Sequence, residues 1–482
     1  MFGNNKPNGA ISGISWKFAE RILAQSVSFL VSIVLARVLM PEQYGTISLV
    51  LVFINIANAF VTNGLGLSLI QKKDADDVDF STIFYCSLIL GLVLYMIVFI
   101  CAPLIACFYG IDDLVIITRI LSIKIIIASI NSVQHAYVSK HFLFQKFFIS
   151  TLFGTVFSGI IGIIMALNGF GVWALVTQYI LNSFIDTILL FITVNWKPKL
   201  LFSFSRAKSL LSYAWKLMLS GVINTTFSQI KNLVIGRIYS KSDLAYYEKG
   251  NYFPQIVINN LNSAISDVVF PFMAKDCDNI YEVKRFARKS LRMISYFVSP
   301  CMAGMMVISN NFIIVLLTNK WIECVPYLRI MCIYWLTQPL QTVNWQAIKA
   351  VGRSDICLKL EIVKKGISIV ALISVMKISV SAIAITSVLL AIFSVVINAI
   401  PVAKLLKYTL FEQILDVLPS FLLSAIMAFL IFPVSLLQLS PLVILSAQCF
   451  LGVLVYMIFS KLLMIDEYFF LVNRLKTFKI VK

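Results

Sequence analysis

Long apolar runs recur along the whole 482-residue chain, and they limit its possible folds more than any other feature. A helix that crosses the roughly 30 Å hydrocarbon core of a bilayer needs about 20 mostly apolar residues. Apolar residues make up 60% of this chain and charged residues 13%, whereas soluble domains are about 45–50% apolar. The chain is therefore predicted to be an all-α integral membrane protein, which excludes an ordinary soluble enzyme.

Fourteen runs have the length of a membrane-spanning helix when Pro, Gly and charge clusters are taken as their ends. Twelve spans is the alternative, because the seventh and eighth runs are polar. The predicted spans are 13–38, 43–70, 80–107, 112–137, 147–168, 171–195, 209–238, 243–271, 287–317, 325–348, 356–376, 378–405, 412–435 and 440–463.

The basic residues, which give the chain a net charge of +18, lie mostly between these runs. If the N-terminus is inside, the cytoplasmic segments hold twenty-nine of them and the outer loops with their helix ends hold seven. The positive-inside rule then places both termini in the cytoplasm and requires an even number of spans. The predicted location is the cytoplasmic (inner) membrane. Basic residues at these places contact lipid headgroups, so a nucleic-acid partner is not expected.

Several other functional classes lack their sequence signatures. The first apolar run is interrupted by Lys17, Glu20 and Arg21, so no signal peptide is expected. The nine cysteines form no CxxC pair and the two histidines, His135 and His141, have no partner at ligand spacing, so no metal or other cofactor is expected. Neither a Walker A sequence nor a catalytic constellation is present, which argues against an enzyme.

Residues 16–45 and 215–247 look like two copies of one unit. Each begins with Trp-Lys and reaches an arginine, Arg37 or Arg237, about one membrane-spanning helix later. Six spans separate the copies, so they have the same orientation and predict two lobes related by an axis along the membrane normal. A chance match of two short motifs is the alternative.

The repeat sets the predicted domain boundaries. Pro41 follows Arg37 and predicts a tight outer turn, because proline disfavours helix at the residue before it and suits the first turn of the next helix. The predicted parts are an N-terminal lobe at 1–196, a cytoplasmic linker at 197–208, a C-terminal lobe at 209–408, and an extra helix pair with a basic tail at 409–482.

Polar residues concentrate on single faces of the first, second, seventh and eighth spans. These four spans are predicted to surround a water-accessible cavity, while the last pair faces lipid. The fourth span also has one polar face, formed by Lys124, Asn131 and His135. Residues predicted to line the cavity and contact sugar are Asn55, Asn58, Asn224, Asn259 and Ser263; hydrogen bonding between helices is their alternative role.

A lysine at the centre of a span costs about 2.5–3.5 kcal/mol, so it normally has water, a partner or a function. The predicted cationic cavity residues are Lys17, Arg21, Lys124, Lys216, Lys231 and Lys249. They outnumber the embedded acids Glu20, Asp186, Glu248 and Asp267, so the cavity is predicted to attract a phosphate or pyrophosphate. The alternatives are pairing with an acid for Lys124 and Lys231, and headgroup contact for the other four.

Ion coupling is predicted at Glu20, Asp267 or His135, which could exchange a proton or bind Na⁺. Each has a structural alternative, as a salt-bridge partner of a nearby lysine or as a packing residue.

The segment Ala36–Gly45, which reads ARVLMPEQYG and contains Arg37, Pro41, Tyr44 and Gly45, resembles bacterial polysaccharide-repeat flippases of the Wzx type, near the colanic-acid exporter branch. Weaker similarities are Val269-Phe270-Pro271, Lys320-Trp321 before Pro326, and Gly352-Arg353-Ser354-Asp355. That family shares a superfamily with multidrug and toxin extrusion proteins and lipid II flippases. The resemblance implies two six-helix lobes in a V, an extra helix pair and alternating access.

The cargo implied by the resemblance is an undecaprenyl-pyrophosphate-linked oligosaccharide, with membrane lipids, a polysaccharide polymerase and chain-length machinery as further partners. A multidrug or organic-cation antiporter of the same superfamily is the alternative, and it should have a more acidic or aromatic cavity. A membrane glycosyltransferase or polymerase is disfavoured, because such enzymes need a long outer loop or a soluble catalytic segment that the predicted spans do not leave.

Overall fold

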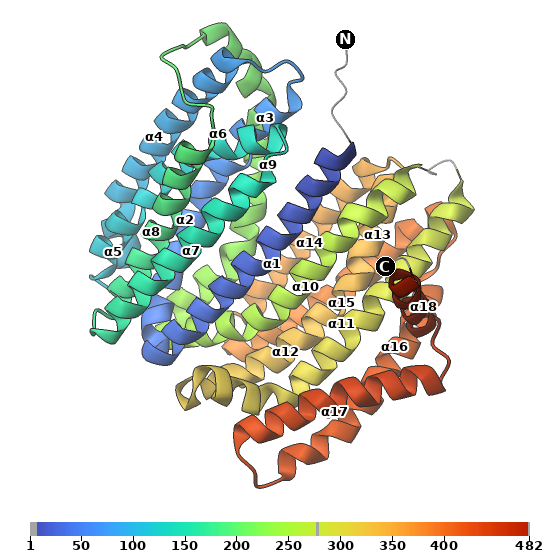
Figure 1. Cartoon of the computed structure of the whole chain (residues 1–482). Helices are drawn as coiled ribbons and strands as arrows, with labels where there is room; N and C mark the ends of the chain where they lie inside the picture. The colour runs from blue at the N-terminus through green and yellow to red at the C-terminus, as the bar shows by residue number, and fades with distance from the viewer. Residues whose placement is uncertain (1–6, 276–278, 481–482) are drawn as a thin grey trace. The chain divides into compact units, whose positions relative to one another are not determined.

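The computed structural model describes residues 7–275 and 279–480, without the side chains of 7–22, 261–272, 274–275, 354 and 474–480. Within these residues every regular element is a helix, as predicted (Figure 1). The α-helices are α1 (Pro7–Val38), α2 (Pro41–Thr62), α3 (Leu65–Gln71), α4 (Asp77–Tyr109), α5 (Leu114–Leu121), α6 (Ile123–Lys140), α7 (Phe144–Leu167), α8 (Val172–Thr193), α9 (Phe204–Ile238), α10 (Lys241–Lys275), α11 (Ile280–Leu317), α12 (Val325–Leu336), α13 (Gln338–Ala350), α14 (Ser354–Val375), α15 (Val380–Leu406), α16 (Leu410–Ile431), α17 (Pro441–Leu462) and α18 (Asp466–Ile480). Two short 3₁₀-helices, η1 (Asn319–Cys324) and η2 (Phe432–Leu436), complete the set.

Each of the fourteen predicted spans coincides with one helix or with two consecutive helices. Nine helical segments of the described residues are long and apolar enough to cross a membrane, and Leu23–Val38 of α1 is a shorter apolar helix. The remaining predicted spans correspond to α9, α10, α12 with α13, and α14. The chain is therefore a multi-pass membrane protein.

Three spans predicted as continuous are divided in the structure. The first division lies at Asn63 and Gly64, where a Cβ on Gly64 would lie 2.1 Å from the Met218 side chain of α9. The second lies at Ser122, whose hydroxyl donates to the Arg119 carbonyl at 2.8 Å and so competes with the helical hydrogen bonds. The third, between α12 and α13, immediately precedes a proline at the second position of α13. Local contacts and sequence therefore divide each of these predicted spans into two consecutive helices.

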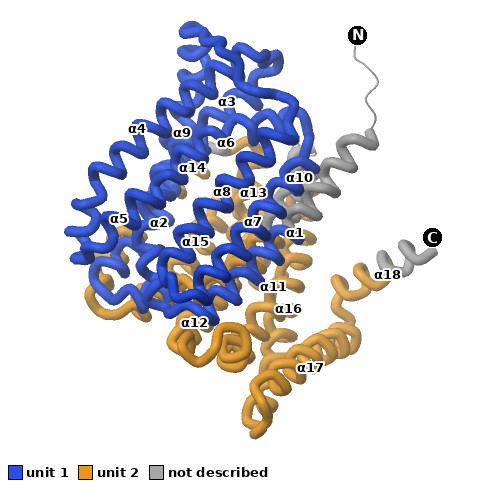
Figure 2. Tube along the Cα trace, turned by 60° about the vertical axis from the view of Figure 1, so that its left-hand side comes forward, with its two compact units in different colours: residues 1–245 blue, residues 246–482 orange. Residues whose placement is uncertain are grey.

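The chain separates into two compact units, residues 1–245 and 246–482 (Figure 2). In the first unit α1 packs on α7, α7 on α8, and α9 along α2, α3 and α4. In the second unit α11 is the common partner of α12, α13, α16 and α17. The predicted lobe boundaries, which assign α9 to the second lobe, remain a prediction.

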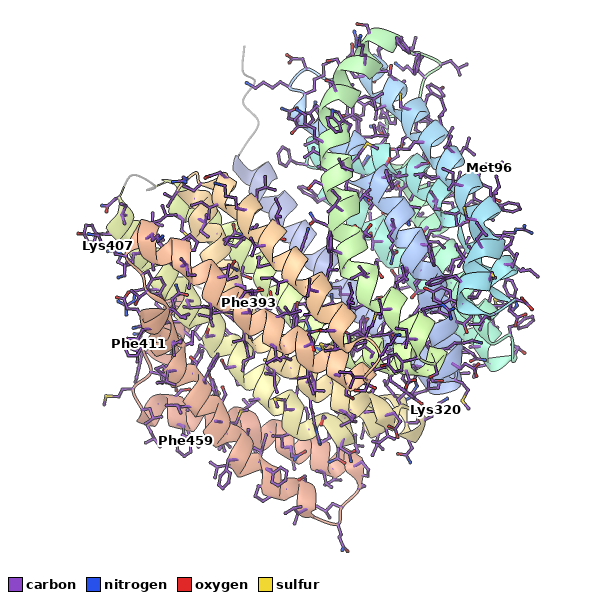
Figure 3. The ribbon with its side chains drawn as sticks, turned by 180° about the vertical axis from the view of Figure 1, so that it is seen from behind. Met96, Lys320, Phe393, Lys407, Phe411 and Phe459 are labelled. Carbon is purple, nitrogen blue, oxygen red and sulfur yellow. The ribbon has the colours of Figure 1, made fainter. Side chains whose placement is uncertain are left out.

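Apolar side chains are exposed on the outer helices of each unit, as expected where helices meet lipid. Met96 on α4 is 53% exposed and Phe411 on α16 is 69% exposed (Figure 3). Phe393 on α15, labelled in the same view, is 37% exposed. These side chains lie on spans whose interiors carry few polar residues.

The two copies of the repeat have the same local structure. In both, two residues connect the helices, 39–40 between α1 and α2 and 239–240 between α9 and α10. The third residue of each second helix accepts a hydrogen bond from the backbone N–H just before that helix: Gln43 from Met40 at 2.9 Å, and Asp243 from Ser240 at 3.2 Å. Met40 is extended and Pro41 begins α2, which confirms the predicted tight turn.

The segment predicted as a linker is fastened to the start of α4. The Lys199 ammonium lies 2.6 Å from an Asp77 carboxylate oxygen, and Arg206 pairs with Asp76. The Lys199 N–H also donates to the Ser81 hydroxyl at 3.1 Å. Residues 197–208 are therefore part of the first unit.

Candidate functional site

A polar seam runs between α6 and α8 inside the first unit. On α6 it comprises Lys124, Asn131 and His135, which the seven- and eleven-residue spacings place on one helix face as predicted. On α8 it comprises Tyr179 and Asp186, again seven residues apart. We call these five residues the polar seam.

Lys124 occupies one end of the polar seam, with its ammonium 5.2 Å from the centre of the Tyr179 ring. That distance is typical of a cation–π contact, which balances part of the charge without neutralising it. In the described part of the chain, no carboxylate oxygen lies within 4.0 Å of this ammonium. Lys124 is thus a partly buried cation in a membrane-crossing segment that still has capacity for an anion.

Asp186 occupies the other end of the polar seam. One of its carboxylate oxygens accepts a hydrogen bond from the Asn131 amide at 2.7 Å and lies 3.5 Å from Nε2 of His135. The His135 ring also packs on Phe147 of α7, with ring centres 4.6 Å apart. The predicted ion-coupling residue His135 therefore faces an embedded acid, and its coupling role remains a prediction.

Sequence reasoning noted Asp186 as an embedded acid but did not place it in a site. The signal was available, since Asp186 is the only charged residue between Val172 and Thr193. Its partners could not be identified because they lie 51 and 55 residues earlier in the chain.

The polar face of α9 is more exposed than its opposite face, which packs on other helices. Lys216 and Asn224 are exposed and Lys231 is half-buried. The packed face carries Ala214, which is fully buried, and Gly221, which packs on the side chain of Asn63, the residue that follows α2. The sequence predicts that α9 spans the membrane, and an exposed polar face on such a helix requires water or another polar group beside it.

Asn55 and Asn58 on α2 are both half-buried. The side-chain carbonyl oxygen of Asn58 is enclosed and accepts no hydrogen bond from the residues that the structure describes. A buried polar atom without a protein partner is normally satisfied by water or a ligand. Asn58 thus fits the predicted role of a polar lining residue, which remains untested.

In the second unit, Lys249 is only 8% exposed. Its ammonium lies 5.3 Å from the Tyr252 ring centre and 5.8 Å from that of Trp321, a fully buried residue of η1. Trp321, one of the residues that resemble the flippase family, therefore packs its ring beside the Lys249 ammonium. Asn259, on the same helix α10, is exposed.

The remaining predicted site residues lie outside the described side chains. They are Lys17, Glu20 and Arg21 on α1, and Ser263 and Asp267 on α10.

The motif residues hold the turn between α1 and α2 in the first repeat. Pro41 is buried, Arg37 is exposed, and the Tyr44 hydroxyl donates to the Ser32 carbonyl of α1 at 3.4 Å. Gly45 packs so closely on Lys241 that an added Cβ would lie 1.9 Å from the Lys241 carbonyl oxygen. The Lys241 ammonium also lies 3.3 Å from a Glu42 carboxylate oxygen. The motif therefore joins the two repeat turns, which both belong to the first unit up to residue 245.

The arrangement of these helices matches the fold of solved membrane transporters. The structure of the lipid II flippase MurJ in an inward closed conformation matches with a TM-score of 0.74, at 18% identity, over 95% of this chain and 99% of that chain. An inward-facing multidrug resistance MATE family transporter of the MOP superfamily matches with a TM-score of 0.57, at 14% identity, over 85% of this chain and 98% of that chain.

The sequence comparisons show the family to which the chain belongs. The lipopolysaccharide biosynthesis protein WzxC of Escherichia coli (strain K12) is 25% identical over 370 residues, which are 75% of this chain and 74% of that protein. The family model described as polysaccharide biosynthesis protein matches residues 34–326, more than half of the chain. The chain belongs to this polysaccharide biosynthesis family.

Proposed function

We propose that this chain is a flippase that moves undecaprenyl-pyrophosphate-linked oligosaccharide repeat units across the cytoplasmic membrane. The match to the polysaccharide biosynthesis family and the fold shared with the lipid II flippase MurJ support this function. The observation that carries the proposal is Lys124, a partly buried cation in a membrane-crossing segment, whose ammonium lies 5.2 Å from the Tyr179 ring centre and within 4.0 Å of no carboxylate oxygen of the described side chains.

The physical chemistry of such a cargo suits these residues. A lipid-linked sugar has an anionic, polar head that cannot cross hydrocarbon and a tail that can stay in it. The Lys124 ammonium would bind the pyrophosphate, while the polar face of α9, with exposed Asn224 and half-buried Lys231, would contact the sugars. Alternating access of the two lobes would then expose the head first on one side and later on the other.

The distribution of basic residues supports placing both termini in the cytoplasm. The substrate would come from cytoplasmic glycosyltransferases and pass to a polysaccharide polymerase with its chain-length machinery on the outer side. In this proposal an ion gradient drives transport. The residues that would bind the ion are His135 with Asp186, or Glu20 and Asp267.

The experiment that tests the proposal compares Lys124→Ala with the matched control Lys208→Ala, which removes an exposed lysine from the cytoplasmic end of α9. Transport of a lipid-linked oligosaccharide is measured in proteoliposomes, and surface polysaccharide in cells that lack the native protein. A charge-assisted hydrogen bond is worth about 1.5–3 kcal/mol, so Lys124→Ala is expected to lower transport about 10- to 100-fold. Lys208→Ala should transport normally.

Normal transport by Lys124→Ala at equal membrane abundance would remove Lys124 from the mechanism. The multidrug antiporter alternative is tested in the same strains, because it requires increased drug sensitivity on deletion while surface polysaccharide stays intact.

A further inference from the structure

A cavity of about 460 Å³ lies in the second unit where the start of α11 meets α18. Four cationic side chains of α11 line it at spacings of three, four and seven residues, which place them on one face of the helix. We call it the arginine pocket; it is lined by Arg285, Arg288, Lys289, Arg292, Met293, Asp466, Glu467 and Phe470.

Two of the arginines are held in place by one buried carboxylate. Asp416 of α16 accepts hydrogen bonds from Nε and Nη2 of Arg288, both at 2.8 Å, and from Nε and Nη2 of Arg292 at 2.9 and 2.6 Å. The Tyr408 hydroxyl donates to the same carboxylate at 2.7 Å. One negative charge therefore orients two guanidinium groups, which remain 38–39% exposed toward the pocket.

The other basic side chains of the pocket carry charge that is weakly neutralised. The Lys289 ammonium lies 4.5 Å from the Phe470 ring centre, and no carboxylate oxygen of the described residues lies within 4.0 Å of it. Asp466 is 89% exposed and comes no closer than 3.9 Å to Arg292, and ion pairs so exposed to water contribute little. Arg285 pairs with Glu282 at 2.6 Å but is 72% exposed. Glu467 is the second acid of the lining, and no basic nitrogen of the described side chains lies within 4.0 Å of its carboxylate. The four basic residues of the lining outnumber its two acids, so the pocket favours an anionic group.

Apolar side chains beside the arginine pocket indicate which anionic group it takes. Met293 and Phe470 form part of the pocket wall. At the turn between α17 and α18, Leu463 is 55% exposed and Met464 is 76% exposed. A site with fixed guanidinium groups and a neighbouring exposed apolar surface, at the end of a membrane-crossing helix, has the chemistry of an anionic amphiphile at the membrane surface.

We propose that the arginine pocket binds the phosphate of an anionic membrane phospholipid, with the acyl chains lying against the apolar turn between α17 and α18. Arg288 and Arg292 bind the phosphate oxygens in fixed orientation, and Lys289 adds a mobile ammonium. This site is separate from the polar seam and does not depend on the transported substrate.

The test measures binding of phosphatidylglycerol, phosphatidylcholine and inorganic phosphate to the purified full-length protein by native mass spectrometry. The test variant is Arg285→Gln with Lys289→Gln, which leaves the Arg288 and Arg292 bonds to Asp416 in place. The control variant is Lys208→Gln with Lys359→Gln, which removes two exposed lysines elsewhere. Each basic residue near an anionic membrane surface contributes about fivefold in affinity, so the test variant is expected to bind phosphatidylglycerol about 20-fold more weakly.

Wild type and control should bind phosphatidylglycerol equally well and phosphatidylcholine much more weakly. Unchanged phosphatidylglycerol binding by the test variant would overturn the proposal. Equal affinity for phosphatidylcholine would overturn it too, as would inorganic phosphate binding as tightly as the lipid. Unchanged thermal unfolding of the test variant would show that weaker binding is not a folding defect.

Discussion

At the scale of single residues, Gly45 shows how one position can join the two copies of the repeat. It lies one turn into α2, where alanine would normally be the better helix former by about 1 kcal/mol. An added Cβ would lie 1.9 Å from the carbonyl oxygen and 2.5 Å from the carbonyl carbon of Lys241. Both are backbone atoms, so no side-chain rotation can relieve the overlap. Glycine is required here by close approach of two backbones.

We therefore expect Gly45→Ala to lower the stability of the protein by about 1–3 kcal/mol, the usual cost of overpacking. The matched control is Gly366→Ala on α14, where the added Cβ would meet no other part of the described structure within 4 Å, apart from its own helix backbone and chain neighbours. That variant should be neutral or more stable by up to about 1 kcal/mol. Thermal unfolding of the purified proteins measures both, and equal midpoints for the two variants would contradict this reading of Gly45.

At the scale of elements, the segment at 195–208 is fixed by charges at the start of α4. Asp76 caps α4 by accepting from the Asp79 N–H at 3.0 Å, and it also pairs with Arg206. The hydrogen bond from Arg206 lowers the pKa of Asp76 from 3.8 to about 2. Because the pKa is lower in the folded protein, the contribution of this pair is present above pH 3.8 and is lost as the pH falls toward 2.

We expect Asp76→Asn with Asp77→Asn to expose residues 197–208 to trypsin. Exposed ion pairs are each worth at most about 1 kcal/mol, so removing two of them should accelerate cleavage after Lys199 and Arg206 by no more than about 30-fold. In the wild type, hydrogen exchange in this segment should increase as the pH falls from 4 to 2, after correction for the intrinsic exchange rate. The double variant should lose that increase, and an identical pH response would show that the two carboxylates do not fasten the segment.

At the scale of the whole molecule, the sequence alone predicted the spans, the repeated turn and the α6 face, because each depends on local periodicity. It could not predict which helices pack together. Asp186 meets Asn131 from 55 residues away, and Asp416 meets Arg288 from 128 residues away. From the sequence alone, Arg288 and Arg292 therefore indicate only which side of the membrane their segment lies on. The packing of α9 along α2 could not be predicted either, because an apolar helix face does not by itself specify which helix it packs on.

The junction between the repeat turns also provides a test of the proposed transport cycle. Alternating access by rocking requires the outer ends of the repeat halves to separate once in each cycle. The Glu42 and Lys241 side chains meet at this junction, 3.3 Å apart. We expect Glu42→Cys with Lys241→Cys, joined by a short thiol-specific cross-linker that a reductant can cleave, to lose transport of the lipid-linked oligosaccharide. Reduction should restore it, and each single-cysteine variant should be unaffected, which controls for the nine native cysteines. Full transport by the cross-linked protein would mean that the two turns move as one body, and the separation would then have to occur elsewhere.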